Sequence, residues 1–176
     1  MLSDRLVRLV ETHASKLHRR WTRLLRENPA TPSYHDIEDE ELETNITEVY
    51  RHLGAYMERS HDDEKLVRFL MHIGSRRKAQ RVPLNELVFA IILARRNIYD
   101  FIMEESTFTS TLEYHQLNEF WQRVMNFFDK NIYFVVLGYE HELDKEKHTK
   151  DLVSKLLHSF SLGAFPELEK EQVLQD

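Results

Sequence analysis

Histidines are the side chains of this 176-residue chain that could most readily do chemistry, because a neutral imidazole binds metal ions and haem iron. Two histidines on one helix share a face, and can hold a metal together, when they lie three or four residues apart. Among the ten histidines, His13 and His18 are five apart, and His141 and His148 are seven apart. The stretch HELDKEKH therefore lacks the zinc-protease spacing, and we expect no metal site.

His72 lies in an apolar part of the stretch FLMHIGSRRKAQRVPLNEL, residues 69–87. A helical histidine on an apolar face can bind haem iron or a small ligand inside a bundle. The next histidine is His115, so the helix expected after Pro83 cannot supply an axial one. We favour a histidine at the edge of the core, hydrogen-bonded to backbone or water, and we expect no cofactor. The alternative is a haem-binding gas or redox sensor in which His72 is the ligand.

Other catalytic patterns are missing from the sequence. The chain has no cysteine, which excludes disulfides, thiolate catalysis and Cys-ligated zinc. It has four glycines, with no Gly-rich phosphate loop and no G-x-S-x-G. The carboxylate pairs Asp62–Asp63 and Glu104–Glu105 are expected at helix ends, where nothing shifts their pKa values toward acid–base catalysis. We expect no enzymatic activity.

The basic run SRRKAQR, residues 75–81, could contact phosphate groups. A nucleic-acid patch would need aromatic or further basic residues that converge on it. The run instead follows a helical pattern, and cations at a helix C-terminus complement its dipole. We interpret it as a solvated helix end or as the salt-bridge partner of the acidic loops. The net charge of −6 likewise favours neither nucleic acid nor an anionic membrane as a partner.

Asp129 lies among aromatic residues in the stretch NFFDKNIYF, residues 126–134. An aspartate in such surroundings needs a partner, and we consider Lys130, Arg123 or a tyrosine hydroxyl from another helix. Its functional interpretation is a switchable polar contact at an interface. The favoured alternative is that Asp129 faces water on a thin polar stripe.

The elements that position these residues are predicted to be helices in one domain. Hydrophobic residues are 41% and charged residues 31%, with only four prolines and four glycines, which is too few turn residues for an all-β protein. Helical spacing, capping residues and prolines predict an all-α bundle of five or six helices. The expected helices run from Ser3 or Asp4 to Asn28, from about 39 to 57, from Asp62 or Asp63 to the basic run, from Pro83 to about 105, and from about 111 to 145.

The first predicted helix shows a seam of apolar residues at alternating spacings of three and four. The seam consists of Val7, Val10, Ala14, Leu17, Trp21 and Leu24.

The last predicted helix is long and apolar on more than one face. Arg123, Asp129 and Lys130 interrupt its apolar middle, so it is too polar for a membrane span. We expect one face to pack on the core and another on a second copy of the chain. The residues predicted for this dimer interface and signal helix are Trp121, Val124, Phe128, Asp129, Val135 and Tyr139.

The ends of the chain complete the predicted organisation. Residues 1–145 are expected to form the helical domain, and residues 146–176 a helical extension and a tail or linker stub. The N-terminus MLSDRLVRLVETH has no apolar segment typical of a signal peptide, so a cytoplasmic location is expected.

Three stretches carry a family resemblance: HRRWTRLL at 18–25, SRRKAQRVPLNELVFAIILARRNI at 75–98, and FFDKNIYFVVLGYE at 127–140. Over residues 3–145 the chain resembles the N-terminal sensor domains of RsbR-type co-antagonists, and similar domains head some bacterial histidine kinases. The resemblance implies a globin-like fold that has lost haem, forms a homodimer and passes a stress-response signal through its last helix. Members usually carry an output domain such as a STAS domain or a kinase, and nothing after 145 is long enough. We therefore expect a stand-alone relative or a fragment.

The functional expectation is a non-enzymatic sensory input domain of a bacterial signalling protein. Its partners would be a second copy of the chain, an output domain or signalling protein, and a possible small apolar ligand. The alternatives are the haem sensor that uses His72 and a structural dimerisation or partner-binding module without a ligand.

Overall fold

The computed structural model describes residues 2–58 and 63–141. Every regular element in these two ranges is helical, and this confirms the all-α prediction. The elements are α1 (Leu2–Thr12), α2 (Ala14–Glu27), the short 3-10 helix η1 (Pro32–Tyr34), α3 (Asp39–Met57), α4 (Asp63–Ala79), α5 (Leu84–Glu105) and α6 (Thr111–Glu140).

The predicted first helix is divided in two at His13. The backbone of His13 has φ −107° and ψ 21°, outside helical values. Its Nδ1 lies 2.9 Å from the Leu9 carbonyl oxygen, so the ring competes for a hydrogen-bonding group at the end of α1. Val10 and Leu17 on either side of the break are buried, so the apolar seam continues across it, whereas Leu24 near the end of α2 is exposed.

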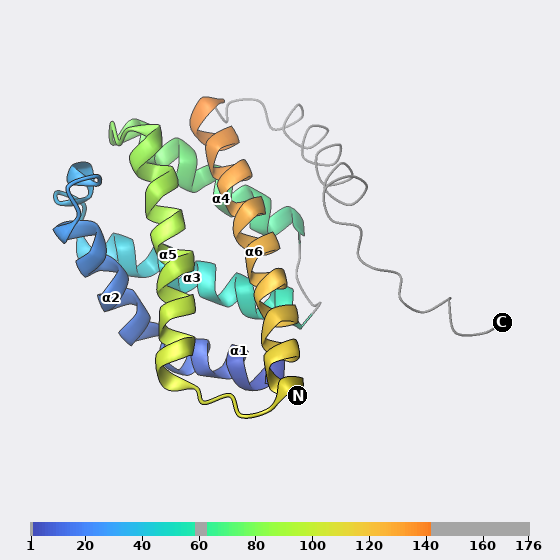
Figure 1. The fold of residues 1–176 in the computed structure, drawn as a ribbon. Helices are drawn as coiled ribbons and strands as arrows, with labels where there is room; N and C mark the ends of the chain where they lie inside the picture. Colours follow the sequence, from blue (N-terminus) through green and yellow to red (C-terminus); the bar gives the residue numbers. More distant parts are fainter. Residues whose placement is uncertain (1, 59–62, 142–176) are drawn as a thin grey trace. The chain divides into compact units, whose positions relative to one another are not determined.

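The helices form two layers with the core between them. Helices α5 and α6 are an antiparallel pair, and α1, α3 and α4 cross behind them (Figure 1). Helix α2 packs against α3 and α5. Large buried side chains from every layer fill the space between, among them Leu17 of α2, Leu42 of α3, Leu66 of α4, Phe101 of α5 and Phe127 of α6. The globin-like arrangement stays a prediction.

Helices α4 and α6 meet backbone to backbone through two glycines. A methyl group on Gly74 would come within 2.0 Å of the Val135 carbonyl oxygen, and one on Gly138 within 2.1 Å of the Met71 carbonyl oxygen. No real side chain tolerates such distances, so only glycine permits this crossing. The contact fixes α6 against α4 near the C-terminal end of the long helix.

Helix α6 begins where the sequence predicts. Ser110 accepts a hydrogen bond from the Glu113 backbone N–H at 3.2 Å, while Glu113 Oε2 accepts from the Ser110 N–H at 3.3 Å. This capping box satisfies two amide groups that the helix leaves free. The expected end at 145 and the predicted extension and tail at 146–176 lie outside the described residues.

None of the helices in the described ranges has both the length and the apolarity that crossing a bilayer requires.

Candidate functional site

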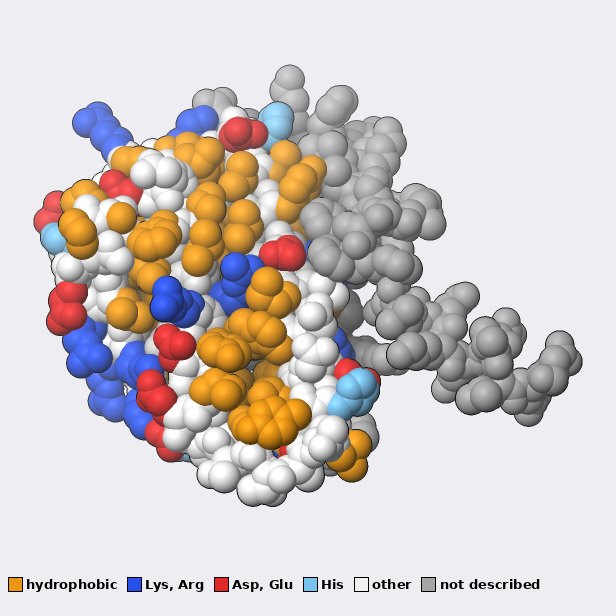
Figure 2. Space-filling view, viewed as in Figure 1, with side chains coloured by type: hydrophobic (Ala, Val, Ile, Leu, Met, Phe, Trp, Pro, Cys, Tyr) orange, Lys and Arg blue, Asp and Glu red, His pale blue; other side chains and the backbone are white. Residues whose placement is uncertain are grey.

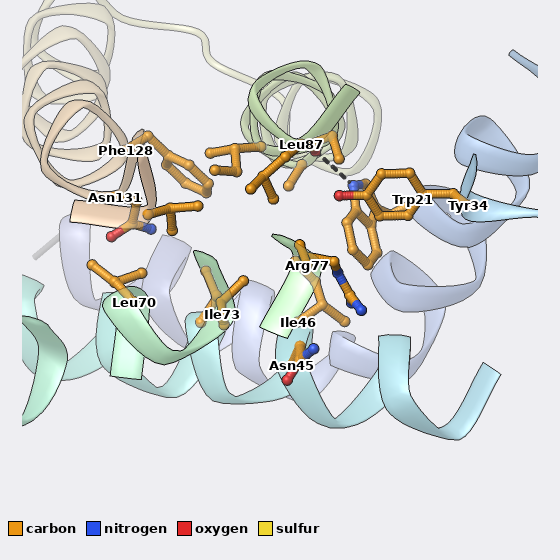
Figure 3. Close-up of a pocket in the computed structure, with 15 residues that line it drawn as sticks. Trp21, Tyr34, Asn45, Ile46, Leu70, Ile73, Arg77, Leu87, Phe128 and Asn131 are labelled. Atoms are coloured by element: carbon orange, nitrogen blue, oxygen red, sulfur yellow. Dashed lines mark hydrogen bonds between the residues drawn. The ribbon is translucent and has the colours of Figure 1, made fainter. Parts of the chain in front are cut away.

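An interior cavity of about 50 Å³ is the clearest candidate site (Figure 3). Side chains from α2 to α6 and from the loop before α3 surround it, and most of them are apolar. The lining residues are Trp21, Tyr34, Asn45, Ile46, Val49, Leu70, Ile73, Arg77, Leu87, Ala90, Ile91, Ala94, Phe128, Asn131 and Val135. The walls thus place a few polar groups in an otherwise apolar space.

Tyr34 reaches the cavity because hydrogen bonds from Ser33 hold η1 against α5. Glu86, in the first turn of α5, accepts hydrogen bonds from the Ser33 backbone N–H at 2.9 Å and from the Ser33 hydroxyl at 3.1 Å. Tyr34 is 1% exposed. Burial raises the pKa of Tyr34 to about 12, although the charge of Arg77 opposes the shift. At neutral pH the cavity therefore contains a neutral phenol.

Arg77 forms another part of the cavity wall, and its charge is paired with a carboxylate of the protein itself. It is 2% exposed, and its guanidinium donates to the carboxylate of Glu41 at the start of α3 and to Gln80 Oε1 at 2.5 Å. Arg76 also donates to Glu41, at 2.8 and 3.0 Å. Burial would raise the pKa of Glu41, but the hydrogen bonds from Arg76 and Gln80 and the charge of Arg77 outweigh it and lower that pKa to about 2.

Of the two interpretations of the basic run, a solvated helix end or a salt-bridge partner, this network confirms the salt-bridge partner. The run ends α4, and its arginines bind the acidic first turn of α3. The burial of Arg77 was not predicted from the sequence, because a run of charged residues does not indicate that one of them is buried.

Two asparagines present polar atoms that have no partner within the described part of the chain. Asn131 of α6 is 2% exposed, and its Oδ1 is buried without a hydrogen bond. The Nδ2 of Asn45 on α3 is also buried without one. Both side chains line the cavity (Figure 3). An unpaired buried polar group costs about 1–3 kcal/mol, so these two atoms stand out in a folded domain.

A surface groove adjoins the cavity at the seam between α3 and α4. It is lined by Glu38, Glu40, Glu41, Thr44, Asn45, His72, Ile73 and Arg76. Asn45 and Ile73 line both the groove and the cavity. These two side chains therefore form the partition between the interior and the surface.

His72 occupies this groove and not the core, so the expected position at the edge of the core is wrong. Its side chain is exposed, because the face that α4 buries carries Leu70, Met71 and Gly74 and leaves position 72 outside. His72 does not line the interior cavity. A drug-sized ligand needs a pocket of about 300–1,000 Å³, so haem does not fit the 50 Å³ space either.

No three His, Asp or Glu side chains within residues 2–58 and 63–141 come together to hold a metal ion.

The six residues predicted for the dimer interface separate into two groups. Val124, Phe128 and Val135 are almost fully buried in their own domain, and this corrects them to core positions. Phe128 and Val135 also line the interior cavity. Trp121, Asp129 and Tyr139 are partly exposed. The Tyr139 hydroxyl donates to the Val82 carbonyl at 2.9 Å, beside the start of α5.

Asp129 pairs with Arg95 of α5, at 3.3 Å between Oδ1 and Nη1. The sequence suggested Lys130, Arg123 or a tyrosine, and it missed Arg95 because nothing in the helical spacing indicates which residue of α5 lies beside Asp129. The Asp129 side chain is 39% exposed and the Arg95 side chain 21% exposed. Asp129 thus faces the surface and bridges the two helices.

Apolar side chains surround this ion pair on the outer face of α5 and α6. Figure 2 shows them gathered along both helices, with charged groups between. We call this surface the α5–α6 stripe and define it by partly or fully exposed residues at helical spacing: Val88, Ile92, Tyr99, Met103, Leu117, Trp121, Met125, Ile132 and Val136. The rings of Tyr99 and Trp121 lie 4.8 Å apart and join the two helices.

The polar residues of the cavity were not singled out from the sequence. Asn131 could have been found, because it lies three residues after Phe128 and four before Val135 and so shares their buried face. Asn45 is next to the buried Ile46 and gives a weaker signal. Tyr34 lies in a loop between two prolines and an acidic run, where no periodicity predicts burial.

Fold and site together define an all-helical domain with a small, largely apolar interior cavity. The model of the family described as the RsbT co-antagonist protein rsbRD N-terminal domain matches residues 15–151. The chain therefore belongs to this family of signalling domains, and the resemblance noted from the sequence is confirmed. Comparison with curated proteins finds no match. Comparison with solved structures finds none either.

Proposed function

We propose that this domain is a non-enzymatic sensory input module that works as a homodimer and transmits its signal through α6. The single observation that carries the proposal is the double role of α6. One side of the helix lines the cavity through Phe128, Asn131 and Val135. The other side contributes Trp121 and Met125 to the α5–α6 stripe.

The α5–α6 stripe supports a second copy of the chain as the partner. Proteins that work as monomers rarely expose contiguous apolar patches of more than a few hundred Å². Partly exposed apolar side chains line both helices of the pair, and Arg95 and Asp129 lie between them. In a two-fold dimer the same stripe on both copies would be buried, and each ion pair could meet its symmetry mate. Charged pairs inside apolar interfaces fix the register of the partners.

Transmission requires that the cavity and the stripe respond to the same change in α6. A signal that shifts α6 relative to α4 would alter the position of Trp121 and Asp129 in the dimer. Such coupling counts as allosteric only if the signal favours one of two packings. The family description names co-antagonists of RsbT, and we propose that the downstream partner is a signalling protein of the RsbT kind, reached through an output domain or directly.

The test of this proposal is the molar mass in solution, measured by light scattering after gel filtration at micromolar concentration. The wild-type chain should elute at about twice its mass of 21.2 kDa. The double variant Tyr99→Glu/Met125→Glu, which puts two charges on the stripe, should elute as a monomer. Thr47→Glu adds a charge to an exposed position of α3 and should stay dimeric. A wild-type monomer, or a double variant that remains dimeric, would overturn the proposed interface.

A further inference from the structure

We infer that the interior cavity is a binding site for a small neutral molecule that carries both a hydrogen-bond donor and an acceptor, such as a short alcohol or a primary amide. Asn131 Oδ1 would accept the hydrogen bond of the ligand, and Asn45 Nδ2 would donate to it. The inference deepens the proposed sensory function, on which it rests, by naming the class of signal.

The volume of the cavity limits the size of the ligand. An apolar protein cavity of about 150 Å³ holds benzene, and a water molecule takes about 30 Å³ of liquid volume. The cavity here measures about 50 Å³. It therefore accommodates a molecule of about two to four heavy atoms in the present conformation.

The polar groups of the walls define the chemistry of that molecule. Asn131 Oδ1 and Asn45 Nδ2 are both buried, and within the described residues neither has a partner. One is an acceptor and the other a donor, so a ligand that carries both a donor and an acceptor matches the unpaired polar atoms of the walls. The Arg77 guanidinium already bonds Glu41 and Gln80, which removes the reason for an anion to bind. The ligand is therefore neutral.

The groove between α3 and α4 provides a route to the cavity. Asn45 and Ile73 form the partition, and Glu41 lies beside them on the groove side. Glu41 joins α3 to α4 through Arg76, Arg77 and Gln80. A ligand would thus pass Asn45 before it reaches Asn131, and the ion pairs would hold the two helices closed around it.

The experiment is an NMR titration of the 15N-labelled full chain with formamide, which has three heavy atoms, a donor and an acceptor. Acetonitrile has the same number of heavy atoms and no donor, so it is the matched control. We expect saturable shifts of the side-chain amide signals of Asn45 and Asn131 with formamide. Three heavy atoms limit the dissociation constant to about a millimolar at best. Acetonitrile should bind at least tenfold more weakly.

Two variants make the result specific to the cavity. Ala94→Val fills the space and leaves both asparagines in place, whereas Asn131→Leu removes the acceptor. Each should weaken formamide binding at least tenfold, and the dispersion of its spectrum verifies that the variant is folded. Leu112→Ala, at a 65% exposed position of α6, should bind as the wild type does. The inference would be overturned if formamide caused linear shifts that do not saturate. It would also be overturned if a folded Ala94→Val variant saturated with formamide as the wild type does.

The same titration on the Tyr99→Glu/Met125→Glu variant separates the two proposals. If this variant binds formamide as the wild type does, the site stands whatever the oligomeric state. If the wild-type chain is a dimer that binds no formamide, the ligand site is wrong and the dimer proposal is untouched.

Discussion

Glu41 is the carboxylate on which the ion pairs between α3 and α4 converge. Replacement of Glu41 by glutamine leaves Arg77 buried without its negative partner. Removing one member of a buried pair is strongly destabilising, and we expect Glu41→Gln to lower the free energy of unfolding by about 3 kcal/mol. Urea denaturation measures it. Glu40→Gln, at the exposed neighbouring position, is the control and should change it by less than about 0.5 kcal/mol.

The pH dependence of this contribution follows from the pKa of Glu41. In the folded chain that pKa is lowered to about 2 from its ordinary value of 4.5. Because the folded-state pKa is the lower one, the stabilisation is complete above about pH 4.5 and is lost as the pH falls toward 2. The difference in unfolding free energy between wild type and Glu41→Gln should shrink across this range. A difference that stays constant down to pH 2 would contradict the assigned role.

The position of His72 predicts the response to haem. Its exposed ring lies outside the cavity, and the cavity is too small for a porphyrin. Added haemin should therefore give no saturable Soret band in the absorption spectrum of either the wild type or His72→Ala. A stoichiometric band that disappears in His72→Ala would restore the haem sensor as an interpretation.

At the residue scale, runs of opposite charge indicate pairing between helices, whereas an isolated ion pair between two helices leaves no pattern in the sequence. Pairing of the basic run with acidic residues was one of two interpretations, beside a solvated helix end, and Arg76 and Arg77 do bind Glu41. Arg95 and Asp129 were not paired, since nothing in the spacing indicates that α5 presents Arg95 to α6. The burial of Asn131 could have been predicted, because its helical spacing places it on the same face as Phe128 and Val135.

Helices α4 and α6 are held at their crossing by Gly74 and Gly138. Alanine at either position puts a methyl group within about 2 Å of a carbonyl oxygen of the other helix. Because backbone atoms cannot move aside as a flexible side chain can, the helices must separate, and we expect each variant to lose about 3 kcal/mol of unfolding free energy. Chemical denaturation of Gly74→Ala and Gly138→Ala measures this loss.

Gly54 of α3 is the matched control for these variants. A methyl group there meets the Glu11 carboxylate at 2.3 Å, which is the end of a flexible side chain on an exposed residue. The side chain can turn away, and alanine favours a helix over glycine by about 1 kcal/mol. Gly54→Ala should therefore be neutral or slightly stabilising. Equal losses for all three variants would mean that helix crossing is not the cause.

At the element scale, the helix boundaries marked by prolines, caps and acidic first turns were predicted well. Pro83 precedes α5, Ser110 caps α6, and the acidic residues from Asp39 begin α3. The break at His13 was missed, because the apolar seam continues through it and histidine is not a helix breaker. The inward side of α6 was also assigned wrongly at Val124, since a helix that is apolar on several faces does not indicate which face is buried.

The whole molecule should show a stability that depends on its own concentration. If the α5–α6 stripe forms a dimer, mass action favours the folded dimer at higher concentration. A tenfold increase in protein should raise the midpoint of thermal unfolding by about 2 °C for a chain of this size. The Tyr99→Glu/Met125→Glu variant should show no such rise. Calorimetry at several concentrations provides the comparison, and a wild-type midpoint independent of concentration would argue for a folded monomer.

The interior cavity has a consequence for the response of the whole molecule to pressure. Its volume of about 50 Å³ is equivalent to about 30 mL/mol, which is within the range of volume decreases that accompany unfolding. Compression therefore favours the unfolded chain, since unfolding eliminates this empty space. A molecule that occupies the cavity removes the void and should make the domain more resistant to hydrostatic pressure. The same space that admits a small ligand thus makes the folded domain compressible, and filling it makes the domain stiffer.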